Sequence, residues 1–248
     1  MTVNALVKSQ AVHSTGYRQI RRPVARPVVE KGLLTPIPWV IAPVLIVLLA
    51  IAALPFVGAA HAADTFRILA LGDSLTAGLG LPREDAFPEK LEMALRAQGI
   101  KVEVVNAGVS GDTTAGGLAR LDWALADKPQ AAIVALGAND GLRALDPERS
   151  RANLDAILTK LKAAGVPVLL AGMKAPPNLG PEYGAAFDRV FPELAEKHRV
   201  LFYPFLLDGV AARDDLNQGD KIHPNAKGVD VIVENILPLV KRLVEGKA

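Results

Sequence analysis

The chain has 248 residues and no cysteine, which excludes disulfides, thiolate nucleophiles and Cys-ligated metals. Six of the 28 Lys and Arg residues, but only one of the 26 acidic residues, lie in residues 1–62. Residues 63–248 therefore keep 22 basic and 25 acidic side chains, a net charge of −3. This slightly acidic part gives no electrostatic reason to expect nucleic acid as a partner. It is long enough for one domain with a substantial core.

Residues 1–62 have the features of an export signal. Residues 33–60 contain no charged side chain, and basic residues precede them. The run ends in Ala60-His61-Ala62, which fits the small-x-small pattern of a signal-peptidase site. We therefore expect cleavage after Ala62 and a periplasmic or secreted product that consists of residues 63–248.

An uncleaved inner-membrane anchor is the alternative for the same segment, because about 20 apolar residues span a bilayer. Pro43 and Pro55 would break or bend such a helix, and we favour cleavage because of the Ala60-His61-Ala62 site. The basic part is long for an export signal, so a second alternative is that translation starts at a codon further downstream. Contact with a membrane is expected only through this leader, if it stays uncleaved.

Strands and helices alternate along residues 63–248. Short apolar runs predict strands over residues 66–71, 102–105, 131–136, 166–171 and 200–203. Helical spacing and Pro or Gly at the ends predict helices over residues 85–98, 114–127, 147–164, within 181–198, and from about 225 to the C-terminus, with a disturbance at Pro238. Strands that are apolar throughout indicate a parallel sheet with helices on both faces.

Three segments rich in small and polar residues follow the first three predicted strands. They are residues 72–75, 110–113 and 137–140. Because ligands bind outside the carboxyl ends of parallel strands, near a switch point of the sheet, we expect the three segments to meet at one edge and to form a site.

Ser74 is the candidate nucleophile, since it follows an apolar strand and a tight turn. Removal of the leader leaves two histidines as candidate bases. His198 lies at a helix end, where a histidine commonly caps carbonyl groups, so we expect it to be structural. His223 lies in a loop, and Asp220 can fold back onto its ring. This spacing fits acid–base–nucleophile chemistry. Taken alone, Ser74 could instead be a turn serine that caps the next helix, and His223 a histidine without a catalytic role in a loop before a helix.

Donors for an oxyanion are available in the same segments. The backbone N–H groups of Ser74 and Gly111 and the carboxamide of Asn139 would form a three-donor oxyanion hole. The alternative for Gly111 is an ordinary turn glycine, and for Asn139 a turn at the end of a strand.

Four ordered blocks together resemble the GDSL, or SGNH, hydrolase family, and most of all its exported thioesterase, lysophospholipase and arylesterase branch. The blocks are Gly72-Asp73-Ser74-Leu75, Ser110-Gly111-Asp112-Thr113, Gly137-x-Asn139-Asp140-Gly141-Leu142-Arg143 and Asp220-x-x-His223-Pro224-Asn225, and the resemblance covers roughly residues 65–243. It implies a flavodoxin-like, three-layer α/β/α sandwich with a five-stranded parallel sheet. It also implies hydrolysis of esters and thioesters through an acyl-serine, without a metal or cofactor.

The segment after the fourth predicted strand, residues 173–183, is a candidate wall of the substrate site. We expect Asn178, Leu179 and Gly180 to contact the substrate, with a plain connector as the alternative. The expected partner is a small-molecule acyl ester or thioester, and the expected state is a monomer.

Two other functions fit part of the pattern. An acyltransferase or a carbohydrate deacetylase could use the same fold, but the latter needs a sugar-binding surface and aromatic residues make up only 5% of the chain. A flavodoxin-like binding module without chemistry would leave Ser74, Asp220 and His223 unexplained. The sequence therefore favours a serine hydrolase of acyl esters.

Overall fold

The computed structural model describes residues 65–246 of the chain. The predicted export signal, residues 1–62, and its cleavage site lie outside the described residues. Within residues 65–246, no helix combines the length and the apolar character that a membrane span requires.

Within the described residues, five parallel strands form one sheet in the order β2-β1-β3-β4-β5. The strands are β1 (Phe66–Gly72), β2 (Val102–Gly108), β3 (Ala131–Ala135), β4 (Val168–Ala171) and β5 (Leu201–Tyr203). This is the strand order of flavodoxin-like folds, in which the switch point lies between β1 and β3. The predicted five-stranded parallel sheet is confirmed.

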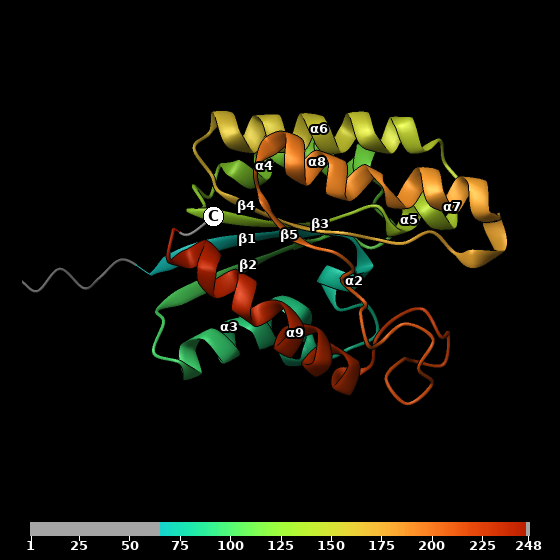
Figure 1. Ribbon diagram of the computed structural model, residues 1–248. Coiled ribbons are helices and arrows are strands. Elements are labelled where there is room, and N and C mark those ends of the chain that lie inside the picture. The colour runs from blue at the N-terminus through green and yellow to red at the C-terminus, as the bar shows by residue number, and fades with distance from the viewer. Residues whose placement is uncertain (1–64, 247–248) are drawn as a thin grey trace, which may run out of the picture. The chain divides into compact units, whose positions relative to one another are not determined.

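Helices cover both faces of this sheet (Figure 1). The helices are α2 (Ser74–Ala77), α3 (Phe87–Ala97), α4 (Thr114–Leu125), α5 (Ala138–Leu142), α6 (Pro147–Ala163), α7 (Pro181–Asp188), α8 (Val190–His198) and α9 (Ala226–Val244), with the single turns η1 (Arg83–Asp85) and η2 (Pro177–Leu179). Helices α3 and α9 pack together below the sheet in Figure 1, whereas α4, α6 and α8 lie above it. The three-layer sandwich expected from the sequence is confirmed.

The core lies on both faces of the central strands. All five residues of β3 are buried, as are the last five of β1, because helices cover each side. Fully buried aromatic rings fill the space between the sheet and the helices on each face; they are Phe87, Phe187 and Phe191. The sheet is therefore a rigid platform for whatever its carboxyl edge carries.

The predicted helix within residues 181–198 is two helices, α7 and α8, which meet at Arg189. The break has a local cause, since Pro192 has no N–H to donate to the carbonyl group of Asp188. Helix α9, in contrast, continues through Pro238.

Candidate active site

Ser74 lies at the first position of α2, two residues after the end of β1. Asp73 caps this short helix, since its Oδ1 accepts a hydrogen bond of 3.0 Å from the N–H of Leu75. Gly72 makes the turn tight, because a Cβ there would overlap Oγ1 of Thr76. A central strand that runs directly into a capped helix thus fixes Ser74 at the carboxyl edge of the sheet.

His223 joins Ser74 to Asp220. Its Nε2 lies 2.9 Å from Oγ of Ser74, and its Nδ1 lies 2.7 Å from Oδ2 of Asp220. The second carboxylate oxygen of Asp220 accepts hydrogen bonds of 3.0 Å from the backbone N–H groups of Ile222 and His223. The carboxylate therefore folds back onto the ring, as the three-residue spacing predicts.

The hydrogen bonds at Asp220 also keep its carboxylate ionised and select the tautomer of the His223 ring. Donation from the backbone N–H of His223, then from that of Ile222 and from the His223 ring, holds the pKa of Asp220 well below its usual range. Because Asp220 is an anion, Nδ1 carries the ring proton and donates it. Nε2 is then free to accept the hydroxyl proton of Ser74.

Gln218 connects the loop of His223 to the segment that follows α2. Its side-chain Nε2 donates to the carbonyl oxygens of Leu79, at 2.7 Å, and Pro224, at 2.9 Å. Its backbone N–H donates to the carbonyl oxygen of His223 at 2.7 Å. These bonds hold two segments together that are far apart in the sequence. No pattern in the sequence points to Gln218, and it was not predicted.

The three predicted oxyanion donors meet at the same place. Ser74, Gly111 and Asn139 all line one pocket. Gly111 has a φ of 86°, a left-handed conformation that favours glycine. The side-chain Nδ2 of Asn139 donates to the carbonyl oxygen of Asp112 at 2.9 Å, which leaves its second hydrogen for another acceptor. Within residues 65–246, the N–H groups of Ser74 and Gly111 have no protein acceptor.

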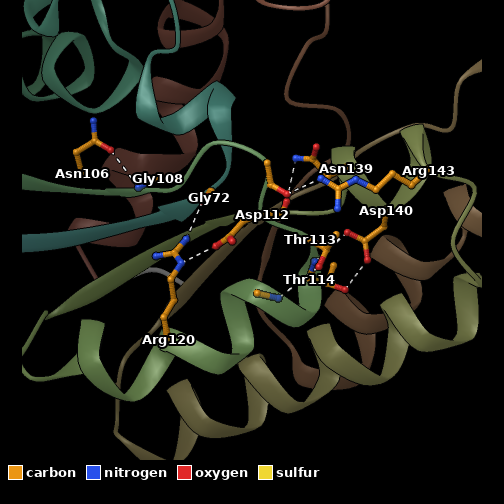
Figure 2. A network of polar contacts seen from close by, with 12 residues as sticks. Gly72, Asn106, Gly108, Asp112, Thr113, Thr114, Arg120, Asn139, Asp140 and Arg143 are labelled. Carbon is orange, nitrogen blue, oxygen red and sulfur yellow. Dashed lines mark hydrogen bonds and ion pairs between the residues drawn. The ribbon is translucent and has the colours of Figure 1, made fainter.

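The residue after Asn139, Asp140, is a buried carboxylate that anchors this part of the chain. Asp140, 2% exposed, accepts hydrogen bonds from the N–H of Thr114 at 2.8 Å, the hydroxyl of Thr114 at 2.6 Å and the hydroxyl of Ser150 at 2.9 Å. Asn153 donates to the same Thr114 hydroxyl at 3.0 Å. Figure 2 shows the contact of Asp140 with Thr114, which ties α5 to the first turn of α4, and the bond from Ser150 ties α5 to the first turn of α6 as well. It therefore fixes the backbone that carries Asn139.

Asp73 is fully buried beside the site, and its Oδ2 has no hydrogen-bond partner among the described residues. Burial raises the pKa of Asp73 to about 6, and the carboxylates of Asp112 and Asp140 add to the effect. The hydrogen bond from Leu75 acts in the opposite direction, as does the positive charge that His223 carries when it is protonated. A buried carboxyl group with a raised pKa thus lies directly before Ser74 in the chain.

A pocket of about 520 Å³ opens beside Ser74 and His223. Its walls are mainly apolar and include Leu79, Leu142, Met173, Phe205, Leu207 and Ile222. The segment after β4 contributes through residues 173–177. The predicted contact residues Asn178, Leu179 and Gly180 are not among those that line the pocket. Asn178 and Leu179 belong to the turn η2, and Gly180 is the N-cap of α7, so these residues connect the pocket wall to the next helix.

His198 lies away from this pocket, at the end of α8. Its Nε2 lies 2.6 Å from Oδ1 of Asp155 on α6, and Lys197 donates to the same oxygen at 2.7 Å. These contacts hold the pKa of Asp155 below its usual range. Among residues 65–246 no cluster of three His, Asp or Glu side chains is arranged to hold a metal ion.

A hydroxyl, an imidazole and a carboxylate in one hydrogen-bonded row, at the carboxyl edge of a parallel sheet, define a class of protein, the α/β serine hydrolases. Comparison with known proteins narrows this class. A model of the GDSL-like lipase/acylhydrolase family matches residues 70–231.

Similar proteins include esterase TesA of Pseudomonas aeruginosa, which is 41% identical over 178 residues, 71% of this chain and 89% of that protein. Thioesterase 1/protease 1/lysophospholipase L1 of Escherichia coli K12 is 39% identical over 73% of this chain and 87% of its own length. The crystal structure of AlinE4, an SGNH-hydrolase family esterase, is 49% identical, with a TM-score of 0.62 over 72% of this chain and 96% of that one. The chain belongs to the GDSL-like lipase/acylhydrolase family.

Proposed function

We propose that the mature protein is a serine esterase that hydrolyses carboxylic esters and thioesters through an acyl-serine on Ser74. The observation that carries the proposal is the position of His223, which lies within hydrogen-bond distance of both Ser74 and Asp220. This arrangement supplies a nucleophile, a base and a group that holds the base in one tautomer.

The reaction follows from these positions. Oγ of Ser74 attacks the carbonyl carbon of the substrate while Nε2 of His223 takes the hydroxyl proton. The imidazolium, stabilised by Asp220, returns this proton to the departing alcohol or thiol. Water then attacks the acyl-serine with His223 again as the base, which releases the acid and restores Ser74.

The negative charge that develops on the carbonyl oxygen needs donors within reach. The N–H groups of Ser74 and Gly111 and the free hydrogen on Nδ2 of Asn139 are the groups proposed for it. Each such donor is worth roughly 2.7–4 kcal/mol of barrier in comparable enzymes. Asp140 holds the turn that carries Asn139, so the donor is in place before substrate binds.

The substrates proposed are aryl esters, acyl-CoA thioesters and lysophospholipids. The names of the relatives, which include an esterase, an arylesterase and a thioesterase/lysophospholipase, support these classes. The apolar walls of the pocket suit an acyl chain, whose burial provides binding energy.

We further propose that the enzyme works as a monomer in the periplasm or outside the cell, after cleavage behind Ala62. The apolar run and the Ala60-His61-Ala62 site support export. One chain supplies all the groups of the proposed site, so no second copy is needed to complete it.

A fluorophosphonate probe tests the proposed nucleophile, and the labelled peptide is identified by mass spectrometry. Ser74 is expected to carry the label. Ser74→Ala is expected to lower kcat for p-nitrophenyl butyrate by roughly 10⁴–10⁶ and to leave the melting temperature nearly unchanged. Turnover within tenfold of the wild type in this variant would contradict the proposal. A panel of aryl esters, acyl-CoAs and lysophospholipids of different chain lengths then identifies the preferred substrate.

A further inference from the structure

Arg120, on helix α4, links two of the segments that form the active site (Figure 2). Its Nε donates to Oδ2 of Asp112 at 2.6 Å, and its Nη2 donates to the carbonyl oxygen of Gly72 at 2.8 Å. Its side chain is 18% exposed and that of Asp112 17% exposed, so solvent screens the pair only in part. Arg120 does not line the pocket, and the proposed chemistry gives it no role.

Both acceptors of Arg120 lie next to groups that the proposed reaction uses. Gly72 is the end of β1, two residues before Ser74. Asp112 follows Gly111, and its own carbonyl oxygen accepts the hydrogen bond from Asn139 at 2.9 Å. The guanidinium of Arg120 thus joins the chain just before Ser74 to Asp112, which follows Gly111 and whose carbonyl oxygen holds the side chain of Asn139.

The geometry of this link requires an arginine. A guanidinium is a planar fork whose nitrogens can donate in two fixed directions at once, whereas the ammonium of a lysine is a point charge. The carboxylate of Asp112 has room at this place because residue 116 is glycine. A Cβ on Gly116 would lie 2.5 Å from Oδ1 of Asp112.

The link is not needed to satisfy an otherwise unpaired carbonyl group. The oxygen of Gly72 also accepts a hydrogen bond of 3.1 Å from the N–H of Val109. What Arg120 adds is a second connection, which runs from the end of β1 to the side chain of Asp112, the residue after Gly111.

We infer that Arg120 is a positioning residue, which sets the location of Gly111 and Asn139 relative to Ser74 through its bonds to Asp112 and Gly72. The inference rests on the proposed function, because it assumes an acyl-serine on Ser74. The bonds of Arg120 hold the donors where the negative charge forms in the transition state, so the residue affects kcat more than substrate binding.

The experiment compares Arg120→Lys, Arg120→Met and Asp112→Asn with the wild type on p-nitrophenyl butyrate. Each variant is expected to lower kcat by roughly 10- to 100-fold, because small displacements of catalytic groups have effects of this size, while KM stays within about twofold. Arg120→Lys and Asp112→Asn each remove only some of the hydrogen bonds between Arg120, Asp112 and Gly72. If Arg120→Met fails to fold, these two variants still test whether Arg120 positions the oxyanion donors.

A transition-state analogue provides a readout that a merely structural role would not change. An alkyl trifluoromethyl ketone adds to Oγ of Ser74 and forms an oxyanion. Its inhibition constant is therefore expected to rise by the same factor by which kcat/KM falls. The inhibition constant of the corresponding carboxylic acid, a product that forms no tetrahedral adduct, should not change.

Arg151 is the matched control. Its side chain is 22% exposed and forms ion pairs with Glu148 on the same helix, α6, at 3.2 Å, and with Glu193 on α8, at 2.6 Å. Arg151→Lys and Arg151→Met remove a comparable ion pair away from the pocket, and they should lower the melting temperature without a change in kcat.

The possible results separate the hypotheses. A fall in kcat and in affinity for the ketone in the Arg120 and Asp112 variants, but not in the Arg151 variants, supports the inference. A loss of thermal stability alone, or a rise in KM at constant kcat, would overturn it and leave the proposed function intact. A wild-type protein that neither hydrolyses the ester nor reacts with the fluorophosphonate would overturn both.

Discussion

Three hydrogen bonds converge on the carboxylate of Asp220, and the anion that they stabilise faces His223. If His223 is the base, His223→Ala should lower kcat by roughly 10⁴–10⁶. Asp220→Asn should lower it by roughly 10²–10⁴, because the ring loses its fixed tautomer. Steady-state kinetics on p-nitrophenyl butyrate measure both effects.

His198 provides the control for this prediction. It pairs with Asp155 away from the pocket, so His198→Ala should leave kcat nearly unchanged and lower the melting temperature slightly. If His198→Ala removed the activity and His223→Ala did not, the assignment of the base would be wrong.

The buried carboxyl group of Asp73 should make stability depend on pH. Burial raises its pKa from 3.8 to about 6, so between these values the folded protein binds the proton more tightly than the unfolded chain. The contribution of Asp73 to the free energy of unfolding therefore falls as the pH rises from about 4 to 6. Asp73→Asn still caps α2 but cannot ionise. The free energy of unfolding of Asp73→Asn, measured relative to that of the wild type, should therefore rise by up to roughly 3 kcal/mol between pH 4 and pH 7.

Urea denaturation of the wild type and Asp73→Asn at pH 4, 5, 6 and 7 checks this expectation. The test is how the difference in unfolding free energy between the two proteins changes with pH. An effect of the amide group on packing that is the same at every pH therefore cancels. Parallel curves of unfolding free energy against pH would show that the folded protein and the unfolded chain bind the Asp73 proton equally, so that burial does not raise its pKa.

At the scale of elements, the contact between α2 and the end of β2 holds Ser74 in place. A Cβ on Gly108 would overlap the backbone N of Ala77 and lie 2.7 Å from its Cα. Because backbone atoms cannot move aside as a flexible side chain does, Gly108→Ala should displace α2. We expect a loss of about 1–3 kcal/mol in unfolding free energy. We also expect a fall in kcat of about 10²-fold, since Ser74 moves with its helix.

Gly184 is the matched control for this variant. It lies within α7, and a Cβ there would have no neighbour within 4 Å. Gly184→Ala should therefore leave kcat unchanged and stabilise the protein by roughly 0.5–1 kcal/mol. Equal behaviour of the two alanine variants in the kinetic assay would contradict the role given to Gly108.

The longer elements could be predicted from the sequence because their apolar patterns extend over several residues. The strand β3, for example, is apolar throughout, and α6 is capped by Asp146, begins at Pro147 and ends at Ala163, two residues before Gly165. The helices α2 and α5 have only four and five residues, too few for a periodic pattern, so the sequence predicts no helix at either place.

The candidate site was predictable where its residues follow strands or lie at short spacing. Ser74, Gly111 and Asn139 follow β1, β2 and β3, and Asp220 lies three residues before His223. Arg120 and Gln218 could not be found in this way, because their partners lie 8 and 48 residues away in one case and 6 and 139 in the other. Such contacts exist only in the folded chain.

At the scale of the whole molecule, the mature N-terminus is a further prediction. Because Ala60-His61-Ala62 follows a long uncharged run, the exported enzyme should begin at Ala63. N-terminal sequencing of the protein from a periplasmic fraction checks this. Recovery of the active protein from membranes with residues 33–62 still attached would show instead that the segment is an anchor.

The hydrogen bond between Ser74 and His223 joins residues that are 149 positions apart. Between them the chain completes the sheet, and only then does α9 follow His223 and pack on α3, where Lys90 donates to Asp230 at 2.6 Å. During synthesis or export, the serine therefore emerges well before the histidine. If Ser74 is the nucleophile and His223 its base, a growing chain carries the first without the second and should not hydrolyse esters. The onset of ester hydrolysis in a refolding or translocation experiment would report the docking of the C-terminal segment, a late contact of high sequence separation.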